Sequence, residues 1–299
     1  MPEQCHGLHE PMKPHTPPWL ALPRRWLSSI KQRTFGWTWP NVRWNLLAEW
    51  VVIVLWAMWV GRVFLNLDPN AWPYGPEFGA VVHPQLVWTL LPKCGDCMLW
   101  NGSMNGGYPA FVDLSGVVLH PLVAITTLLW GAINSAKITI VASLVMAGLA
   151  QWWLARVMGL GVVPRLWSAA LAVVGGHLAW RINSGIFPLL LSTAAASLVI
   201  APGLELALTR SRRAIVWLGG ALALLFVSGQ GYMQMGVIVG LLPAFLVFLF
   251  GDGLRLRPVW KDLMLAGILA VLLSAIFWVP LSQFWPHFAK DADFAFSEA

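Results

Sequence analysis

Eight apolar runs, each close to the length of a membrane span, dominate this sequence. They cover residues 46–66, 117–132, 137–155, 165–180, 186–208, 214–229, 232–250 and 261–281. A helix rises about 1.5 Å per residue, so about 20 apolar residues cross the hydrocarbon core of a bilayer. A chain of 299 residues with this pattern belongs in a membrane and has no room for a large soluble domain.

The composition excludes a water-soluble monomer. Hydrophobic residues make up 58% of the chain and charged residues 11%, whereas soluble domains carry roughly 45–50% and about 25%. The net charge of +6 would suggest nucleic-acid binding in a soluble protein. Here the basic residues adjoin the apolar runs, which is typical of cytoplasmic loops and argues against nucleic acid as a partner.

The positions of the basic clusters indicate how many runs cross the membrane. Arg210 to Arg213 and Arg255 to Lys261 are separated by two runs, so the positive-inside rule places both clusters, and the loop 156–164, in the cytoplasm. Eight crossings would then put the basic N-terminal tail outside. The run 117–132 is short and begins with His120-Pro121, so we expect it to lie on the membrane or re-enter it.

The predicted fold is therefore an all-α polytopic bundle of about seven transmembrane helices with a cytoplasmic N-terminus. Residues 1–44 are expected to form a largely flexible cytoplasmic tail, because they contain no apolar signal-peptide core. Residues 45–282 form the transmembrane module, with a long external loop at 67–136 that carries juxtamembrane helices. Residues 283–299 are interpreted as the start of an external segment of a chain that continues further.

Acidic residues of the first external loop are the candidate catalytic groups. Loops of this length are usually functional, and carboxylates near the membrane are costly unless they are used. Glu77 and Asp68 lead because they follow the first span most closely. The alternative is that these carboxylates are simply solvated.

Cys94 and Cys97 form a Cys-x-x-Cys element in the same loop. On an oxidising outer face this spacing favours a small structural disulfide, while free thiols and a redox or metal role remain alternatives. A zinc site would need two further ligands, and the chain has no second cysteine pair.

Polar side chains at the predicted outer ends of the spans are the candidate substrate-binding groups. Arg181 is suited to the phosphate of a lipid-linked substrate, although an outer arginine also contacts lipid headgroups. The remaining candidates are hydrogen-bonding residues of two glycine-containing turns: Asn105, Tyr108, Gln230, Tyr232 and Gln234. Each turn is equally interpretable as a simple connection between helices.

Several short motifs together resemble a known superfamily. They are Trp100-Asn101 through Asn105-Gly106-Gly107-Tyr108-Pro109, His120-Pro121-Leu122, Gly175-Gly176-His177 to Arg181, Ile186-Phe187-Pro188-Leu189, and Gly229-Gln230. Over roughly residues 45–282 the chain resembles the GT-C integral-membrane glycosyltransferases, in particular the bacterial YfhO-like membrane proteins.

The resemblance implies a seven-span module in a bacterial plasma membrane. It also implies transfer of a sugar from a polyprenyl-phosphate donor to an acceptor on the outer face, by an inverting mechanism. Glu77 or Asp68 would be the base, and Arg181 the phosphate partner. The first loop has no adjacent Asp-Asp, Asp-Glu or Asp-x-Asp pair, so the cofactor stays unknown and a divalent metal remains an open alternative.

Two other function classes remain open at this point. One is a transporter or flippase of a lipid-linked substrate. The sequence shows no internal repeat and few ionisable residues within the spans, and both observations argue against it. The other is a noncatalytic subunit of a larger membrane complex, in which the 20 tryptophans would contact partners.

Overall fold

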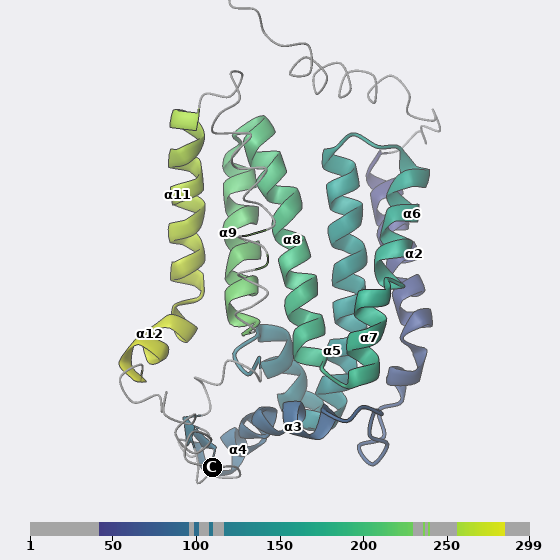
Figure 1. Cartoon of the computed structure of the whole chain (residues 1–299), viewed down its shortest axis with the longest axis vertical. Helices are drawn as coiled ribbons and strands as arrows, with labels where there is room; N and C mark the ends of the chain where they lie inside the picture. The colour runs from purple at the N-terminus through teal and green to yellow at the C-terminus, as the bar shows by residue number, and fades with distance from the viewer. Residues whose placement is uncertain are drawn as a thin grey trace, which may run out of the picture. The chain divides into compact units, whose positions relative to one another are not determined.

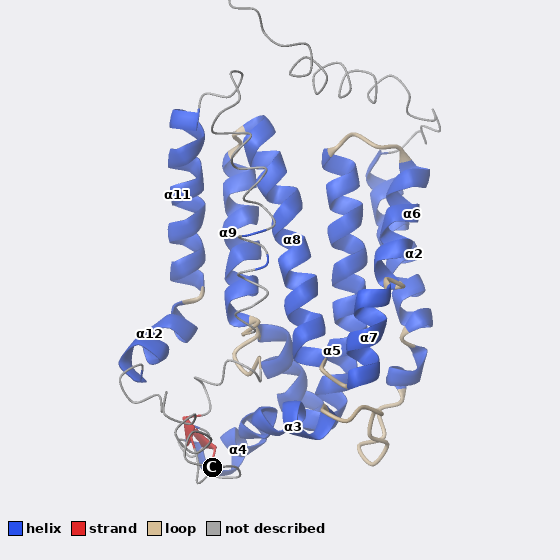
Figure 2. Ribbon diagram, viewed as in Figure 1, coloured by secondary structure: helices blue, strands red, loops and turns tan. Residues whose placement is uncertain are grey.

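The computed structural model is a bundle of helices. It describes residues 42–95, 99–101, 108–109, 117–229, 236, 239 and 256–284. In chain order its elements are α2 (Val42–Val60), η2 (Arg62–Leu65), α3 (Phe78–Val82), η3 (His83–Leu86), α4 (Val87–Cys94), β1 (Trp100–Asn101), β2 (Tyr108–Pro109), α5 (Pro121–Val157), α6 (Val162–Val173), α7 (Gly176–Ser184), α8 (Phe187–Thr209), α9 (Arg212–Val227), α11 (Leu256–Leu273) and α12 (Ala275–Phe284) (Figures 1 and 2). The strands form one short antiparallel pair. The predicted helical class is confirmed.

Three of the described helical segments are long and apolar enough to cross a membrane. They are α5, the combined segment α6–α7 (Val162–Ser184), and α8. The pair α11–α12, bent by 70°, makes a fourth if it is counted as one span. The apolar part of α2, Leu46–Val60, is shorter, and most of the predicted span at 232–250 lies outside the described residues. The structure thus supports a membrane protein, while the number of seven spans stays a prediction.

Helix α5 is broken by a sharp kink at Gly131. Its backbone there is not helical, with φ 78° and ψ 166°. The hydroxyls of Thr126 and Ser135 lie 2.7 Å apart, and Ser135 also donates to the carbonyl of Val123 at 3.3 Å. Nine residues would separate two side chains by roughly 13.5 Å along a straight helix. The segment 121–130 therefore folds back onto the start of the long helix 132–157, and does not extend it.

The core of the bundle lies between α5 and α8. Ala136 and Ile140 of α5 pack in one cluster with Leu190 and Ala194 of α8. Small side chains let two helix backbones approach closely, which is the main source of helix packing in a membrane. Exposed apolar side chains cover the outside of other helices, including Trp50, Leu55 and Trp59 on α2, as expected for a surface that contacts lipid.

The helix ends form two chemically different groups. The starts of α2, α6, α9 and α11 and the ends of α5 and α8 lie together, at the top of Figure 1. We call this the basic end, because these helix ends carry Arg156, Arg165, Arg210, Arg212, Arg213 and Lys261. We call the opposite end, with α3, α4, α7, α12 and the first part of α5, the loop end. The basic clusters thus share one end of the bundle, as the crossing argument requires.

Candidate functional site

Glu77 and Arg181 come from distant parts of the chain and lie in segments that are joined at the loop end. The backbone N–H of Glu77, just before α3, donates to the carbonyl of Ser184 in the last turn of α7 at 3.2 Å. Arg181 lies three residues earlier on α7. The two backbones touch at Gly75 and Gly185, where a Cβ built on Gly75 would lie 2.5 Å from Gly185 Cα.

Aromatic packing holds these segments together. The ring of Phe78 lies 5.9 Å from the ring of Phe187 at the start of α8 and 6.1 Å from the ring of Trp72. Phe78 and Phe187 are fully buried. Because Glu77 is the residue before Phe78, burial of this ring fixes the position of the Glu77 backbone against the turn between α7 and α8.

The guanidinium of Arg181 has no carboxylate partner among the described residues. The ion pair found among the described residues joins Arg165 to Glu49, at the other end of the bundle. Arg181 is partly buried, its Nε lacks a hydrogen-bond partner, and its Cζ lies 4.9 Å from the centre of the Trp180 ring. A positive charge held in this way attracts an anion such as phosphate.

Asp68 shapes the loop. Its Oδ1 accepts a hydrogen bond from the N–H of Asn70 at 2.9 Å, which closes a local Asx turn. The turn is anchored from α5, because Lys137 Nζ donates to the carbonyls of Asn66 and Asp68, each at 2.7 Å. Asn134 donates to the carbonyl of Leu67 at 2.8 Å. The Asp68 carboxylate is exposed, so it remains accessible as well as structural.

The sequence did not single out Lys137, although a lysine at the start of an apolar run, between two such runs, was the available signal. Glu49 was missed too. At 4% exposure this α2 carboxylate accepts hydrogen bonds from Trp152 of α5 and Arg165 of α6, each at 2.5 Å. A buried charge is tolerated when it is paired and hydrogen-bonded, so Glu49 joins three helices and is fully engaged in that role.

The other predicted site residues are placed only in part. Cys94 is disulfide-bonded, whereas Cys97 lies outside the described residues. Tyr108 is described by its backbone, which pairs with Asn101. Asn105, Gln230, Tyr232 and Gln234 also lie outside the described residues. The binding roles of these residues stay predictions.

His120 is the buried histidine of the loop end. It caps α5, with its Nδ1 accepting from the N–H of Leu122 at 3.3 Å. Burial lowers the pKa of His120 to about 4, so its ring is neutral at pH 7 and carries its proton on Nε2. In the described part of the chain, no group of three or more His, Cys, Asp or Glu side chains is arranged to hold a metal ion.

Comparisons with protein-family models, with curated proteins and with solved structures found no match to this chain.

Proposed function

We propose that this protein is a membrane glycosyltransferase that transfers a sugar from a polyprenyl-phosphate donor to an acceptor at the loop end. The observation that carries the proposal is the junction of Glu77 and Arg181. A backbone hydrogen bond joins Glu77 to the last turn of α7, the helix that carries Arg181, and the guanidinium of Arg181 has no carboxylate partner among the described residues. A base and a phosphate-binding cation are the two groups that such a transfer needs.

In the proposed reaction the acceptor hydroxyl attacks the anomeric carbon of the donor sugar. The new carbon–oxygen bond forms as the bond from that carbon to the lipid phosphate oxygen breaks, and its electron pair leaves on the phosphate. Glu77 takes the hydroxyl proton, a role that is worth about 10²–10⁴-fold in rate. Arg181 stabilises the charge of the departing phosphate. Glu77 is preferred to Asp68 as the base because the Asp68 carboxylate already closes a turn.

The proposed setting is a seven-span module of a bacterial plasma membrane, with the basic end in the cytoplasm and the loop end outside. The grouping of basic residues at one end supports this orientation by the positive-inside rule. The prenyl chain of the donor would lie in the surrounding lipid. Transport is less well supported, because buried Lys137 is already bonded to three oxygen atoms and so is not a vacant site for a coupled ion.

The test is a pair of assays on the full chain in lipid nanodiscs. Binding of a polyprenyl phosphate is measured first, and sugar release from a panel of polyprenyl-phosphate sugars second. We expect Arg181→Gln to weaken binding and lower turnover by about 10²–10³-fold. We expect Glu77→Gln to leave binding intact and lower turnover by about 10²–10⁴-fold, whereas Asp68→Asn keeps most of it.

Arg62 provides a matched control. Like Arg181, Arg62 lies at the loop end and over the ring of a nearby tryptophan: its Cζ lies 5.1 Å from the centre of the Trp59 ring. Arg62→Gln should therefore change neither assay. Normal turnover in both Glu77→Gln and Arg181→Gln would rule the proposed site out.

A further inference from the structure

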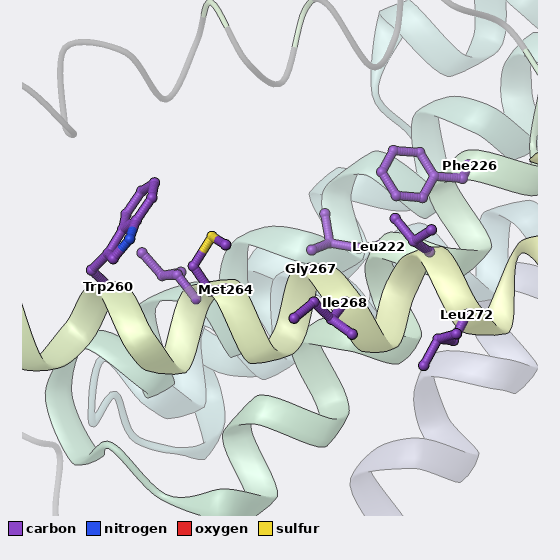
Figure 3. A pocket seen from close by; sticks show the side chains of 9 residues that line it. Leu222, Phe226, Trp260, Met264, Gly267, Ile268 and Leu272 are labelled. Carbon is purple, nitrogen blue, oxygen red and sulfur yellow. The ribbon is translucent and has the colours of Figure 1, made fainter.

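An apolar groove runs between α9 and α11, on a part of the bundle that the proposed transfer site does not use. It has a volume of about 530 Å³ and is lined by Leu222 and Phe226 of α9 and by Trp260, Met264, Ile268 and Leu272 of α11 (Figure 3). Met264, Ile268 and Leu272 are 47%, 53% and 67% exposed. The groove is therefore open along its length and accessible from the hydrocarbon of a membrane.

Basic residues lie in the first turns of the two helices that form this groove, and we call that end of the groove its mouth. The two helices meet at Gly219, where an added Cβ would lie 3.1 Å from the carbonyl oxygen of Ala266. Arg212 precedes Gly219 by seven residues and therefore lies on the same face of α9, and Lys261 precedes Ala266 by five, so each lies roughly 8–10 Å further along its helix. Because α9 and α11 start at the same end of the bundle (Figure 1), these cations lie at the same level.

The charge at this mouth is positive and unpaired within the described chain. Arg210, Arg212, Arg213 and Lys261 are exposed, and the nearby carboxylates are Glu205 and Asp262, so four cations stand against two anions. None of these residues takes part in an ion pair with a described residue. Trp260, which lines the groove and is about half exposed, adds an indole side chain of the kind that favours the headgroup level of a bilayer.

We propose that the α9–α11 groove binds one anionic phospholipid. Its phosphate headgroup contacts Arg212 and Lys261, and one acyl chain lies along Met264 and Ile268. The charge at the mouth selects an anionic lipid over a zwitterionic one, and the apolar lining accepts a chain but offers it no hydrogen bonds. This site stands at the basic end, so it does not depend on the proposed sugar transfer.

The experiment is native mass spectrometry of the full chain released from nanodiscs of phosphatidylglycerol and phosphatidylcholine in equal amounts. We expect one phosphatidylglycerol to be retained in preference to phosphatidylcholine. A basic residue near an anionic lipid surface contributes about fivefold in affinity, so Arg212→Gln with Lys261→Gln should lower retention by more than tenfold. The double variant Arg62→Gln, Lys93→Gln removes the same charge away from the groove and should have no effect.

A second variant tests the groove itself. Gly267 lines it, and a Cβ built there meets no atom within 4 Å, so Gly267→Leu fills the groove without a clash. Gly220→Leu is the matched control, because Gly220 is also a helical glycine with open space around its added Cβ. We expect only Gly267→Leu to abolish retention. Equal retention of both lipids, equal effects of the two leucine variants, or a cross-link that shows the groove filled by another part of this chain or by a second copy would overturn the proposal.

Discussion

Single residues at the loop end show why a buried charge can be structural in a membrane protein. Lys137 is 2% exposed, and an ammonium group without partners would be very costly at such a site. Its Nζ instead donates to the carbonyls of Asn66 and Asp68, which turns the chain after the first long helix. The sequence could not predict this role, because the acceptors are backbone atoms about 70 residues away that any residue type would supply.

His120 gives a prediction for the pH dependence of stability. Burial lowers the pKa of His120 from 6.5 to about 4, so the unfolded state binds a proton more readily than the folded state. Stability is fully present above pH 6.5 and is lost as the pH falls from 6.5 towards 4. From this shift we expect a loss of about 2 kcal/mol at pH 5, seen as a lower Tm at pH 5 than at pH 7.5.

The variant His120→Asn isolates this contribution. Asparagine still caps a helix through its side-chain oxygen and does not titrate in this range. We expect the variant to show a smaller drop in Tm between pH 7.5 and pH 5 than the natural protein. An equal drop in both would assign the pH dependence to other groups.

The residue types of the candidate site come from the sequence, whereas the meeting of the two segments that carry them does not. An acid early in the external loop and an arginine at an outer helix end, Glu77 and Arg181, were both expected from the chemistry of a phosphate donor. Their segments meet through the backbone hydrogen bond between Glu77 and Ser184 and the close approach of Gly75 and Gly185, across more than 100 residues. A hydrogen bond between two backbone groups does not depend on residue type, so the sequence alone does not predict this contact.

At the scale of elements, glycines determine where helices break and where loops dock. The sequence analysis expected the run 117–132 to be separate from a true span, on the evidence of His120-Pro121 and Trp130-Gly131. The structure shows the break at Gly131, whose φ of 78° is a conformation that glycine adopts readily. The position of this short helix on the membrane remains a prediction.

Gly185 provides a test of loop docking. It ends α7 with φ 80°, and a Cβ added there would lie 2.9 Å from the backbone nitrogen of Phe78 and 3.1 Å from Gly75 Cα. Gly185→Ala should therefore cost about 1 kcal/mol for the positive φ and about 1–3 kcal/mol more for the clash. We expect a lower Tm and faster proteolysis of the loop before Phe78.

Gly159 separates the two costs. Its φ is 78°, and an added Cβ meets no atom within 4 Å. Gly159→Ala thus carries the backbone strain without the clash and should lower the Tm less than Gly185→Ala. If the two variants behave alike, close packing of the loop against the end of α7 is not what holds it in place.

At the scale of the whole molecule, hydrophobicity predicted helix positions well. The runs 186–208 and 214–229 correspond to α8 and α9 within two residues at each end. A chain segment in lipid must form all its backbone hydrogen bonds internally, so an apolar segment that crosses lipid is helical along its length. The bend of 70° between α11 and α12 was not predicted. The run 261–281 is predominantly apolar on both sides of the bend. Its Ser274 hydroxyl donates to the carbonyl of Ala270, a local hydrogen bond that hydropathy does not predict.

The directions of α9 and α11 lead to a prediction about membrane orientation. Both start at the basic end (Figure 1), and the positive-inside rule predicts that this end is cytoplasmic and the loop end external. We therefore expect cysteines introduced at Asn70 and Asn183 to react with a membrane-impermeant maleimide added to intact cells. A cysteine at Pro164, in the first turn of α6, should react only after the cells are opened.

The natural protein, with its own three cysteines, gives the background signal. Labelling of position 164 in intact cells together with protection of positions 70 and 183 would invert the topology, and would move Glu77 and Arg181 to the cytoplasmic side, where an acceptor outside the cell could not reach them.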